Sequence, residues 1–312
     1  MKNDKGRVLI AAPVNNVLID GLTDAGYICA LHVDITQAMA PLFIKDCVGV
    51  ITSTRLQLDK ELIDAAPSLQ WIGRMGSGME VIDTVYAAEK NIACYSSPEG
   101  NSNAVGEHAI GMLLSLLNRI SVSNAEVKSG LWLREENRGT ELYGKTIGII
   151  GFGHTGRSFA QKLQGFDVRI LAYDKYSDGE VPSYVTKCND LSPIFDQADI
   201  ISFHVPLQAD TVHYFDTAFI NGMQRPFILI NTARGVVTDT AALSAGLKNG
   251  KITGACLDVF EQEPLSKMNN TMRAMFDDLV QLPQVLITPH IAGYTVEALY
   301  KMSKVLLDKI TI

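Results

Sequence analysis

Short apolar runs alternate with helical patterns along most of the chain. In the first hundred residues, strand-like runs are found at 7–12, 28–33, 48–52, 69–72 and 92–95. Each run is apolar at consecutive positions and not only at every second one, which is typical of parallel strands that are buried on both faces. The alternation therefore predicts an α/β fold in which helices cover both faces of a parallel sheet.

The same alternation returns after residue 145. Its strand-like runs lie at 146–150, 168–173, 200–204, 227–231, 255–260 and 285–288. A last helical pattern covers about 295–309, and Asp59 is expected to cap a helix in the first block. The two blocks predict two α/β domains, and so does the length of 312 residues, which is more than one ordinary core supports.

The segment that joins the two blocks has two parts. Residues 103–120 are helical and apolar nearly all round, which indicates a buried core helix; their position also suits a connection between domains. Residues 124–143 are more polar and predict a solvated surface arm. Because Leu131 and Trp132 are apolar anchors within it, the same segment is also a candidate dimer arm.

Composition and charge exclude several classes of function. Hydrophobic residues make up 47% of the chain and the net charge is −7 without a basic run, so we expect a globular protein that does not bind nucleic acid. No apolar run reaches the length of about 18–20 residues that spans a bilayer, and the polar start lacks the apolar stretch of a signal peptide. The 5 cysteines are scattered without a C-x-x-C pair, which favours reduced thiols, no metal site and a cytoplasmic location.

A glycine-rich turn follows the run at 146–150. Gly151, Gly153 and Gly156 have the G-x-G-x-x-G spacing of a dinucleotide-binding turn. The first glycine permits a sharp turn, the second lets the backbone approach a pyrophosphate, and the third lets the following helix pack close to the strand. His154 and Thr155 begin that helix, whose free N–H groups favour phosphate, so both are candidate cofactor contacts.

Asp174 supplies the context that this turn needs, since glycine turns also occur in units that bind nothing. It ends the next strand-like run, where a carboxylate accepts hydrogen bonds from the ribose hydroxyls of an adenine dinucleotide. An ordinary turn aspartate would look the same, but the glycine turn upstream favours the functional interpretation. A carboxylate there repels a 2′-phosphate, so the sequence favours NAD over NADP, although Lys175 beside it works against that choice.

Three side chains of suitable chemistry follow strand-like runs of the second block. They are Arg234, Glu263 and His290. Open α/β sheets bind ligands at the carboxyl ends of their strands. A nicotinamide enzyme for hydroxy or oxo acids needs an acid/base, a cation for the carboxylate and a group that orients the acid/base. Each residue alone has an ordinary structural explanation, but the three together favour this chemistry.

These residues and their surroundings resemble the D-isomer-specific 2-hydroxyacid dehydrogenase family. Besides the glycine turn and Asp174, the resemblance rests on His204-Val205-Pro206-Leu207, Asn231-Thr232-Ala233-Arg234-Gly235, Asp258-Val259-Phe260-Glu261-Gln262-Glu263-Pro264 and Thr288-Pro289-His290-Ile291-Ala292-Gly293. In the first block, residues 73–83 resemble the family's substrate loop, and residues 103–108 resemble the start of its interdomain helix. The resemblance covers essentially the whole chain.

The resemblance implies two doubly wound parallel-sheet domains. A Rossmann NAD-binding domain, residues 102–291, would be inserted into a flavodoxin-like substrate-binding (catalytic) domain, residues 1–101 plus 292–312. The active-site cleft would then lie at the hinge. The resemblance also implies a homodimer that forms through the NAD-binding domain and the arm at 124–143.

The resemblance also implies roles for individual residues. His290 would be the general acid/base, Glu263 would hydrogen-bond its other ring nitrogen, and Arg234 would hold the substrate carboxylate or carbonyl oxygen. Asp258 would orient the nicotinamide carboxamide, and further cofactor contacts would come from His204, Pro206, Thr232 and Ala233. Besides Arg234 and His290, the substrate would contact Arg74, Met75, Gly76, Ser77, Gly78 and Asn103, with the N–H groups near 76–78 as a small anion-binding nest.

The sequence leaves the identity of the 2-hydroxy acid open. Arg74 and Arg55 are candidate cations for a phosphate group, and Gly73-Arg74 resembles short phosphoglycerate-oxidising members, so 3-phosphoglycerate dehydrogenase-like activity is the first prediction. Thr52-Ser53 departs from the Arg-Ser pair of those members, which keeps glyoxylate or hydroxypyruvate reduction as the alternative. An alternative of another class is an NAD-responsive binding scaffold, against which the short termini argue.

Overall fold

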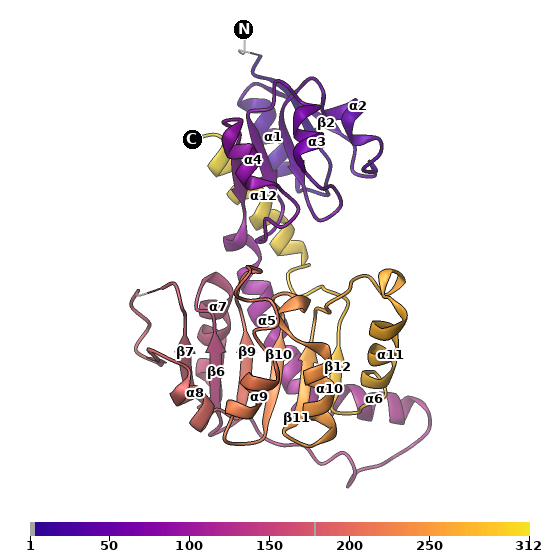
Figure 1. Ribbon diagram of the computed structural model, residues 1–312, viewed down its shortest axis with the longest axis vertical. Coiled ribbons are helices and arrows are strands. Elements are labelled where there is room, and N and C mark those ends of the chain that lie inside the picture. Colours follow the sequence, from indigo (N-terminus) through magenta and orange to yellow (C-terminus); the bar gives the residue numbers. More distant parts are fainter. Residues whose placement is uncertain (1–3, 178) are drawn as a thin grey trace. The chain divides into compact units, whose positions relative to one another are not determined.

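The computed structural model describes residues 4–177 and 179–312 (Figure 1). The chain forms two compact units: unit 1 contains the chain up to Asn103 together with Gly293–Ile312, and unit 2 contains Ala104–Ala292. The chain leaves unit 1 within helix α5 (Pro98–Leu117) and returns to it ahead of helix α12 (Val296–Ile310). In the described part of the chain, no helix combines the length and hydropathy that crossing a membrane requires.

Unit 1 is built on a five-stranded parallel sheet with the order β2-β1-β3-β4-β5. This is the flavodoxin-like doubly wound order. Its strands are β1 (Gly6–Ile10), β2 (Tyr27–Leu31), β3 (Cys47–Thr52), β4 (Trp71–Arg74) and β5 (Ala93–Ser96). The helices between them are α1 (Asn16–Asp24), α2 (Ala40–Ile44), α3 (Lys60–Asp64) and α4 (Thr84–Glu89).

The elements of unit 1 follow from local chemistry and from packing. Asp59 accepts a hydrogen bond from the Leu62 N–H at 2.9 Å, which confirms the predicted helix cap. Helix α12 returns to this unit and packs on α1. The two helices lie so close that a Cβ at Gly21 would be 2.3 Å from the Leu307 side chain. Fully buried strand residues such as Leu9 and Val50 belong to an apolar cluster that joins the sheet to α2, α3 and α4.

Unit 2 is built on a seven-stranded sheet with the order β12-β11-β10-β9-β6-β7-β8, in which every pairing is parallel. Counted from β6, this is the Rossmann order 3-2-1-4-5-6 with one further strand. The strands are β6 (Thr146–Ile150), β7 (Arg169–Tyr173), β8 (Val185–Lys187), β9 (Ile200–Phe203), β10 (Phe227–Asn231), β11 (Ile252–Leu257) and β12 (Val285–Ile287).

Helices cover both faces of this sheet, as Figure 1 shows for unit 2. They are α6 (Ile120–Lys128), α7 (His154–Leu163), α8 (Ser192–Gln197), α9 (Thr217–Gly222), α10 (Thr240–Lys248) and α11 (Asn270–Leu279), besides most of α5. Two apolar clusters form the core; one contains Phe203, Phe215 and Phe219, and the other lies between α5, α7 and the sheet. The predicted class of two doubly wound parallel-sheet domains is therefore confirmed.

The structure corrects several predicted bounds. The helix predicted over 103–120 begins earlier, at Pro98, since proline suits a first helical turn. It ends at Leu117 because Arg119 is left-handed, with φ 54°, and separates α5 from α6. Helix α6 occupies the start of the segment predicted as a polar arm, and the short edge strand β8 has no clear apolar pattern.

Candidate active site

The glycine turn joins β6 to α7 and has the geometry that the fingerprint predicts. Gly151 has φ +90°, and a Cβ there would lie 2.6 Å from the His204 carbonyl oxygen. A Cβ at Gly156 would lie 2.2 Å from the carbonyl oxygen of Gly151, so α7 packs directly on the turn. A Cβ at Gly153 would meet nothing within 4 Å, and this residue is exposed at the N-cap of α7. The turn therefore leaves open space where a pyrophosphate would approach the helix N-terminus.

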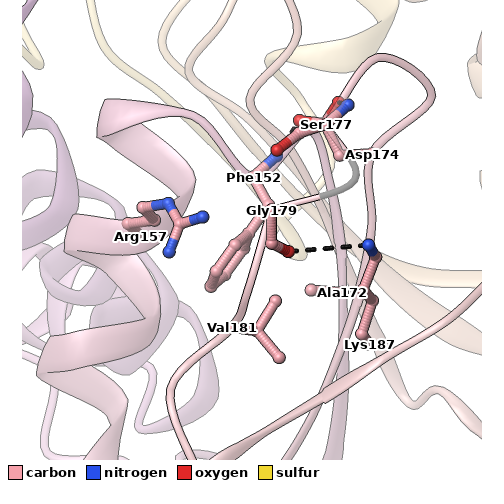
Figure 2. A pocket seen from close by; sticks show the side chains of 8 residues that line it. All are labelled: Phe152, Arg157, Ala172, Asp174, Ser177, Gly179, Val181 and Lys187. Atoms are coloured by element: carbon pink, nitrogen blue, oxygen red, sulfur yellow. Dashed lines mark hydrogen bonds between the residues drawn. The ribbon is translucent and has the colours of Figure 1, made fainter.

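Asp174 follows β7, and its carboxylate is fixed by backbone groups. It accepts hydrogen bonds from the N–H of Phe152 at 2.7 Å, of Tyr176 at 2.9 Å and of Ser177 at 3.0 Å. A carboxylate has about four acceptor sites, so one remains on the oxygen bonded to Phe152 for a ribose hydroxyl. Asp174 lines a small pocket, which Figure 2 shows with Phe152, Arg157, Ala172, Ser177, Gly179, Val181 and Lys187. The remaining acceptor site of Asp174 thus suits the ribose of a nucleoside.

The next cofactor candidates lie at the carboxyl ends of β9 and β10. His204 is buried, its Nε2 lies 2.8 Å from the Ser202 hydroxyl, and its ring packs on Phe159. Burial lowers the pKa of His204 to about 3, so the ring is neutral. Among the described residues, His204 Nδ1 and the Thr232 hydroxyl are buried polar atoms without a hydrogen-bond partner, which fits a site that binds a polar ligand. Pro206 is exposed, and Ala233 is buried next to Thr232.

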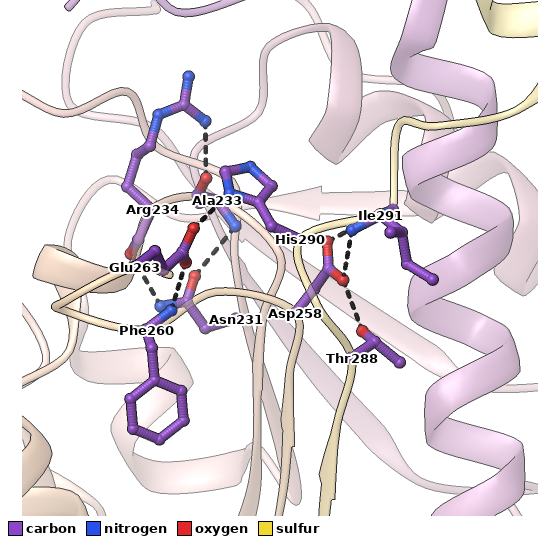
Figure 3. A network of polar contacts seen from close by, with 10 residues as sticks. Asn231, Ala233, Arg234, Asp258, Phe260, Glu263, Thr288, His290 and Ile291 are labelled. Atoms are coloured by element: carbon purple, nitrogen blue, oxygen red, sulfur yellow. Dashed lines mark hydrogen bonds and ion pairs between the residues drawn. The ribbon is translucent and has the colours of Figure 1, made fainter. Parts of the chain in front are cut away.

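His290 and Glu263 form the pair that the sequence predicts. The Nδ1 of His290 lies 2.7 Å from Glu263 Oε2, while Glu263 Oε1 accepts a hydrogen bond from the Phe260 N–H at 2.6 Å (Figure 3). An Nδ1–H that donates to the carboxylate leaves Nε2 as the ring nitrogen for proton exchange. His290 has a left-handed backbone, φ 56°, and its side chain is 45% exposed, so the imidazole is presented to solvent.

Asp258 holds the segment that carries His290. Its carboxylate, 1% exposed, accepts hydrogen bonds from the Thr288 hydroxyl at 2.5 Å and from the N–H of Ile291 at 2.9 Å and of Ala292 at 2.8 Å. Its carbonyl oxygen also accepts from the His290 N–H at 2.8 Å. Three acceptor sites of the carboxylate are therefore occupied by donors of the protein itself, so Asp258 has a structural role that the sequence does not reveal.

Arg234 follows β10, and its backbone is held from both sides by Asn231. The Asn231 side chain donates to the Arg234 carbonyl oxygen and accepts from the Ala233 N–H, both at 3.0 Å. The guanidinium donates to the Ala233 carbonyl oxygen at 2.7 Å. Since β10, β11 and β12 are neighbours in one parallel sheet, Arg234, Glu263 and His290 follow successive strands at the same edge. The structure thus brings the three predicted catalytic residues together.

Apart from Arg234 and His290, the predicted substrate residues lie in unit 1, and most of them are at the carboxyl end of β4. Arg74 is 8% exposed and donates to the Met75 carbonyl oxygen, and a Cβ at Gly76 would lie 1.9 Å from its Nη1. Gly76, with φ +139°, donates its N–H to the Ser97 hydroxyl at 3.0 Å. Ser77 and Gly78 are half-buried in the same loop, and Asn103 lies in α5. The loop is thus wrapped around one buried guanidinium.

Sequence reasoning missed three groups around these sites. Thr288 lies inside a recognised motif, yet its link to Asp258 and, at 3.0 Å, to His108 Nε2 appears only in the structure. Ser97, whose hydroxyl accepts from the Gly76 N–H, directly follows β5, and a polar residue at that position is a signal that the sequence does contain. The pairing of Lys175 Nζ with Asp210 Oδ2, at 2.5 Å, joins loops far apart in the sequence and had no local signal. No group of three or more His, Cys, Asp or Glu suited to a metal occurs among residues 4–177 and 179–312.

The chain is similar in sequence and in fold to several known proteins. The family model described as D-isomer specific 2-hydroxyacid dehydrogenase, NAD binding domain, matches residues 110–292. A glyoxylate reductase of Thermofilum pendens is 37% identical over 84% of this chain and 76% of its own length. A D-3-phosphoglycerate dehydrogenase of Archaeoglobus fulgidus is 31% identical over 97% of this chain, but this chain spans only 56% of that relative's length. The crystal structure of the TT0316 protein from Thermus thermophilus superposes with a TM-score of 0.84 at 27% identity, covering 96% of this chain and 94% of the other.

The strand order of unit 2 is that of a Rossmann domain, and the family model that matches it describes an NAD-binding domain. The chain belongs to the D-isomer specific 2-hydroxyacid dehydrogenase family.

Proposed function

We propose that this protein transfers a hydride between C2 of a small D-2-hydroxy acid and NAD. The observation that carries the proposal is the 2.7 Å pair of His290 and Glu263 at the sheet edge that also presents Arg234. When bound, the nicotinamide supplies the hydride acceptor or donor. His290 takes the hydroxyl proton at Nε2 during oxidation and returns it during reduction, while Glu263 holds Nδ1 and stabilises the charged ring. Arg234 binds the carboxylate or carbonyl oxygen of the substrate.

The cofactor and domain assignments belong to the same proposal. Gly151, Gly153 and Gly156 with the start of α7 would hold the pyrophosphate, and Asp174 would accept from the adenosine ribose. Because this carboxylate repels a 2′-phosphate, NAD is preferred over NADP. Residues 102–291 would form the NAD-binding domain, and residues 1–101 with 292–312 the substrate-binding domain.

For the substrate, we propose a hydroxy acid with a second anionic group, of which 3-phosphoglycerate is the leading candidate. Arg74 is a buried cation in the predicted substrate loop, and a buried guanidinium suits an oxyanion partner. The second candidate is glyoxylate or hydroxypyruvate reduction. It is favoured because Arg55, the other predicted phosphate ligand, is 54% exposed and lies 3.5 Å from Asp34, which leaves the phosphate short of cations.

A substrate panel tests both levels of the proposal. NAD-dependent oxidation rates would be measured with 3-phosphoglycerate, 3-sulfolactate, D-glycerate and D-lactate, and NADH-dependent reduction rates with glyoxylate and hydroxypyruvate. We expect turnover with at least one of them and a preference for the doubly anionic acids. A preference for D-lactate or glyoxylate would overturn the substrate choice, and NADH binding without turnover on any acid would instead favour a binding scaffold.

We further propose that the protein is a cytoplasmic homodimer. Within the predicted arm, the side chains of Trp132 and Leu131 are 82% and 49% exposed, and large exposed apolar groups of this kind suit a protein interface.

A further inference from the structure

Lys175, Tyr176 and Asp210 form a polar cluster beside the pocket that contains Asp174. Lys175 and Tyr176 follow Asp174 directly after β7, while Asp210 lies in the segment after β9. The Lys175 ammonium lies 2.5 Å from Asp210 Oδ2, and the Tyr176 hydroxyl donates to the same oxygen. The ammonium also lies 5.3 Å from the centre of the Tyr176 ring. The cluster therefore ties together two loops at the carboxyl edge of the sheet.

The charges of this cluster are matched. The hydrogen bond to Asp210 raises the pKa of Lys175, and the same bond lowers the pKa of Asp210, so both groups are ionised near neutral pH. The side chains of Lys175 and Asp210 are 55% and 35% exposed. An exposed pair of this kind adds little to folding stability, so its position beside Asp174 is the more informative property.

The pocket of Asp174 has two further cations on its walls, and both are engaged by the backbone. Arg157 donates to the Glu180 carbonyl oxygen at 3.1 Å and lies over the Phe152 ring, and Lys187 donates to the Gly179 carbonyl oxygen at 3.5 Å (Figure 2). Lys175 has a full counter-charge in Asp210.

We propose that Asp210 is a determinant of cofactor choice: its carboxylate pairs with Lys175 and so withholds that cation from the 2′-phosphate of NADP. Two carboxylates then act together, since Asp174 repels a 2′-phosphate and Asp210 occupies the neighbouring lysine. The position of Lys175 in the sequence alone suggests that it works against a preference for NAD. Its pairing with Asp210 removes that effect. The inference rests on the proposed placement of the adenosine ribose at Asp174.

The test is a double-mutant cycle read out by cofactor binding, which needs no substrate. Dissociation constants of NADH and NADPH would be measured by nicotinamide fluorescence for the wild type, Asp210→Asn, Lys175→Met and the double variant. We expect Asp210→Asn to improve NADPH binding relative to NADH by about two- to fivefold, because one exposed charge contact contributes up to about 1 kcal/mol. In the Lys175→Met background the same change should have less than about a twofold effect.

Two controls sharpen the result. Asp278→Asn removes one carboxylate from an exposed pair with Lys248 in the same unit, at 3.5 Å, and should leave the cofactor ratio unchanged. The gain in Asp210→Asn should also shrink in about 1 M salt, because the contact is electrostatic. An unchanged ratio in Asp210→Asn, or an equal gain with and without Lys175, would overturn the inference. Failure of the wild type to bind NADH would instead count against the proposed function.

Discussion

Replacing Gly153 by alanine tests the location of the cofactor without disturbing the fold. An added Cβ would meet nothing within 4 Å, and the backbone of Gly153, with φ −77° and ψ −154°, is extended. Alanine is a poorer N-cap than glycine, but it also restricts the unfolded chain, and the two effects of about 0.5–1 kcal/mol oppose each other. We therefore expect a free energy of unfolding within about 1 kcal/mol of the wild type.

The effect of this substitution on NADH binding should be much larger. If the pyrophosphate packs on the Cα of Gly153, the new methyl group occupies its place. Forcing one methyl into a packed contact costs about 1–3 kcal/mol, which corresponds to roughly 5- to 150-fold weaker binding. Fluorescence titration with NADH measures this loss, and thermal unfolding of the free protein measures the stability.

Gly156→Ala is the matched comparison, because it adds the same methyl group two positions from the helix start. There the Cβ would lie 2.2 Å from the carbonyl oxygen of Gly151, so α7 must move away from the turn. We expect this variant to lose about 1–3 kcal/mol of stability, or roughly 2–12 °C in Tm, along with NADH affinity. If Gly153→Ala bound NADH within twofold of the wild type, the cofactor would not lie on this turn.

Three further predictions concern burial and assembly. Burial lowers the pKa of His204 from an ordinary 6.5 to about 3, so between these values the unfolded chain binds one more proton, and the free energy of unfolding falls by up to about 1.4 kcal/mol for each pH unit of acidification. His204→Gln should flatten this slope in urea unfolding between pH 7 and 4, and an equal slope in both proteins would contradict the prediction. Asp258→Asn should leave a buried N–H unsatisfied and lower the free energy of unfolding, measured by thermal unfolding, by about 1–3 kcal/mol. The exposed control Asp278→Asn should change it by less than about 0.5 kcal/mol. Trp132→Asp should convert the proposed dimer to a monomer in light scattering, and a persistent dimer would place the interface elsewhere.

The sequence predicts the fold and much of the site because both depend on short-range signals. Consecutive apolar positions identify the parallel strands, and the spacing of Gly151, Gly153 and Gly156 identifies the turn. Arg234, Glu263 and His290 are visible because each follows a strand, and parallel strands place such residues at one edge.

What the sequence does not predict depends on contacts between distant segments. The carboxylate of Asp258 holds the backbone around His290, and nothing near Asp258 in the sequence indicates this. The pairing of Lys175 with Asp210 likewise joins residues 35 positions apart, and neither residue has a local signal for it. The break at Arg119 was missed because a left-handed arginine within a helical pattern has no compositional signal.

The most direct test of the proposed chemistry compares His290→Asn with His213→Asn. Both histidines have left-handed backbones, with φ 56° and 49°, which asparagine tolerates, and both lie 2.7 Å from a glutamate, Glu263 and Glu261 respectively. With the best acid from the panel, His290→Asn should lose at least about 100-fold in kcat while its NADH dissociation constant stays within about twofold. His213→Asn should retain most of the wild-type kcat. Substantial turnover by His290→Asn, or an equal loss in both variants, would contradict the role of His290 as the acid/base.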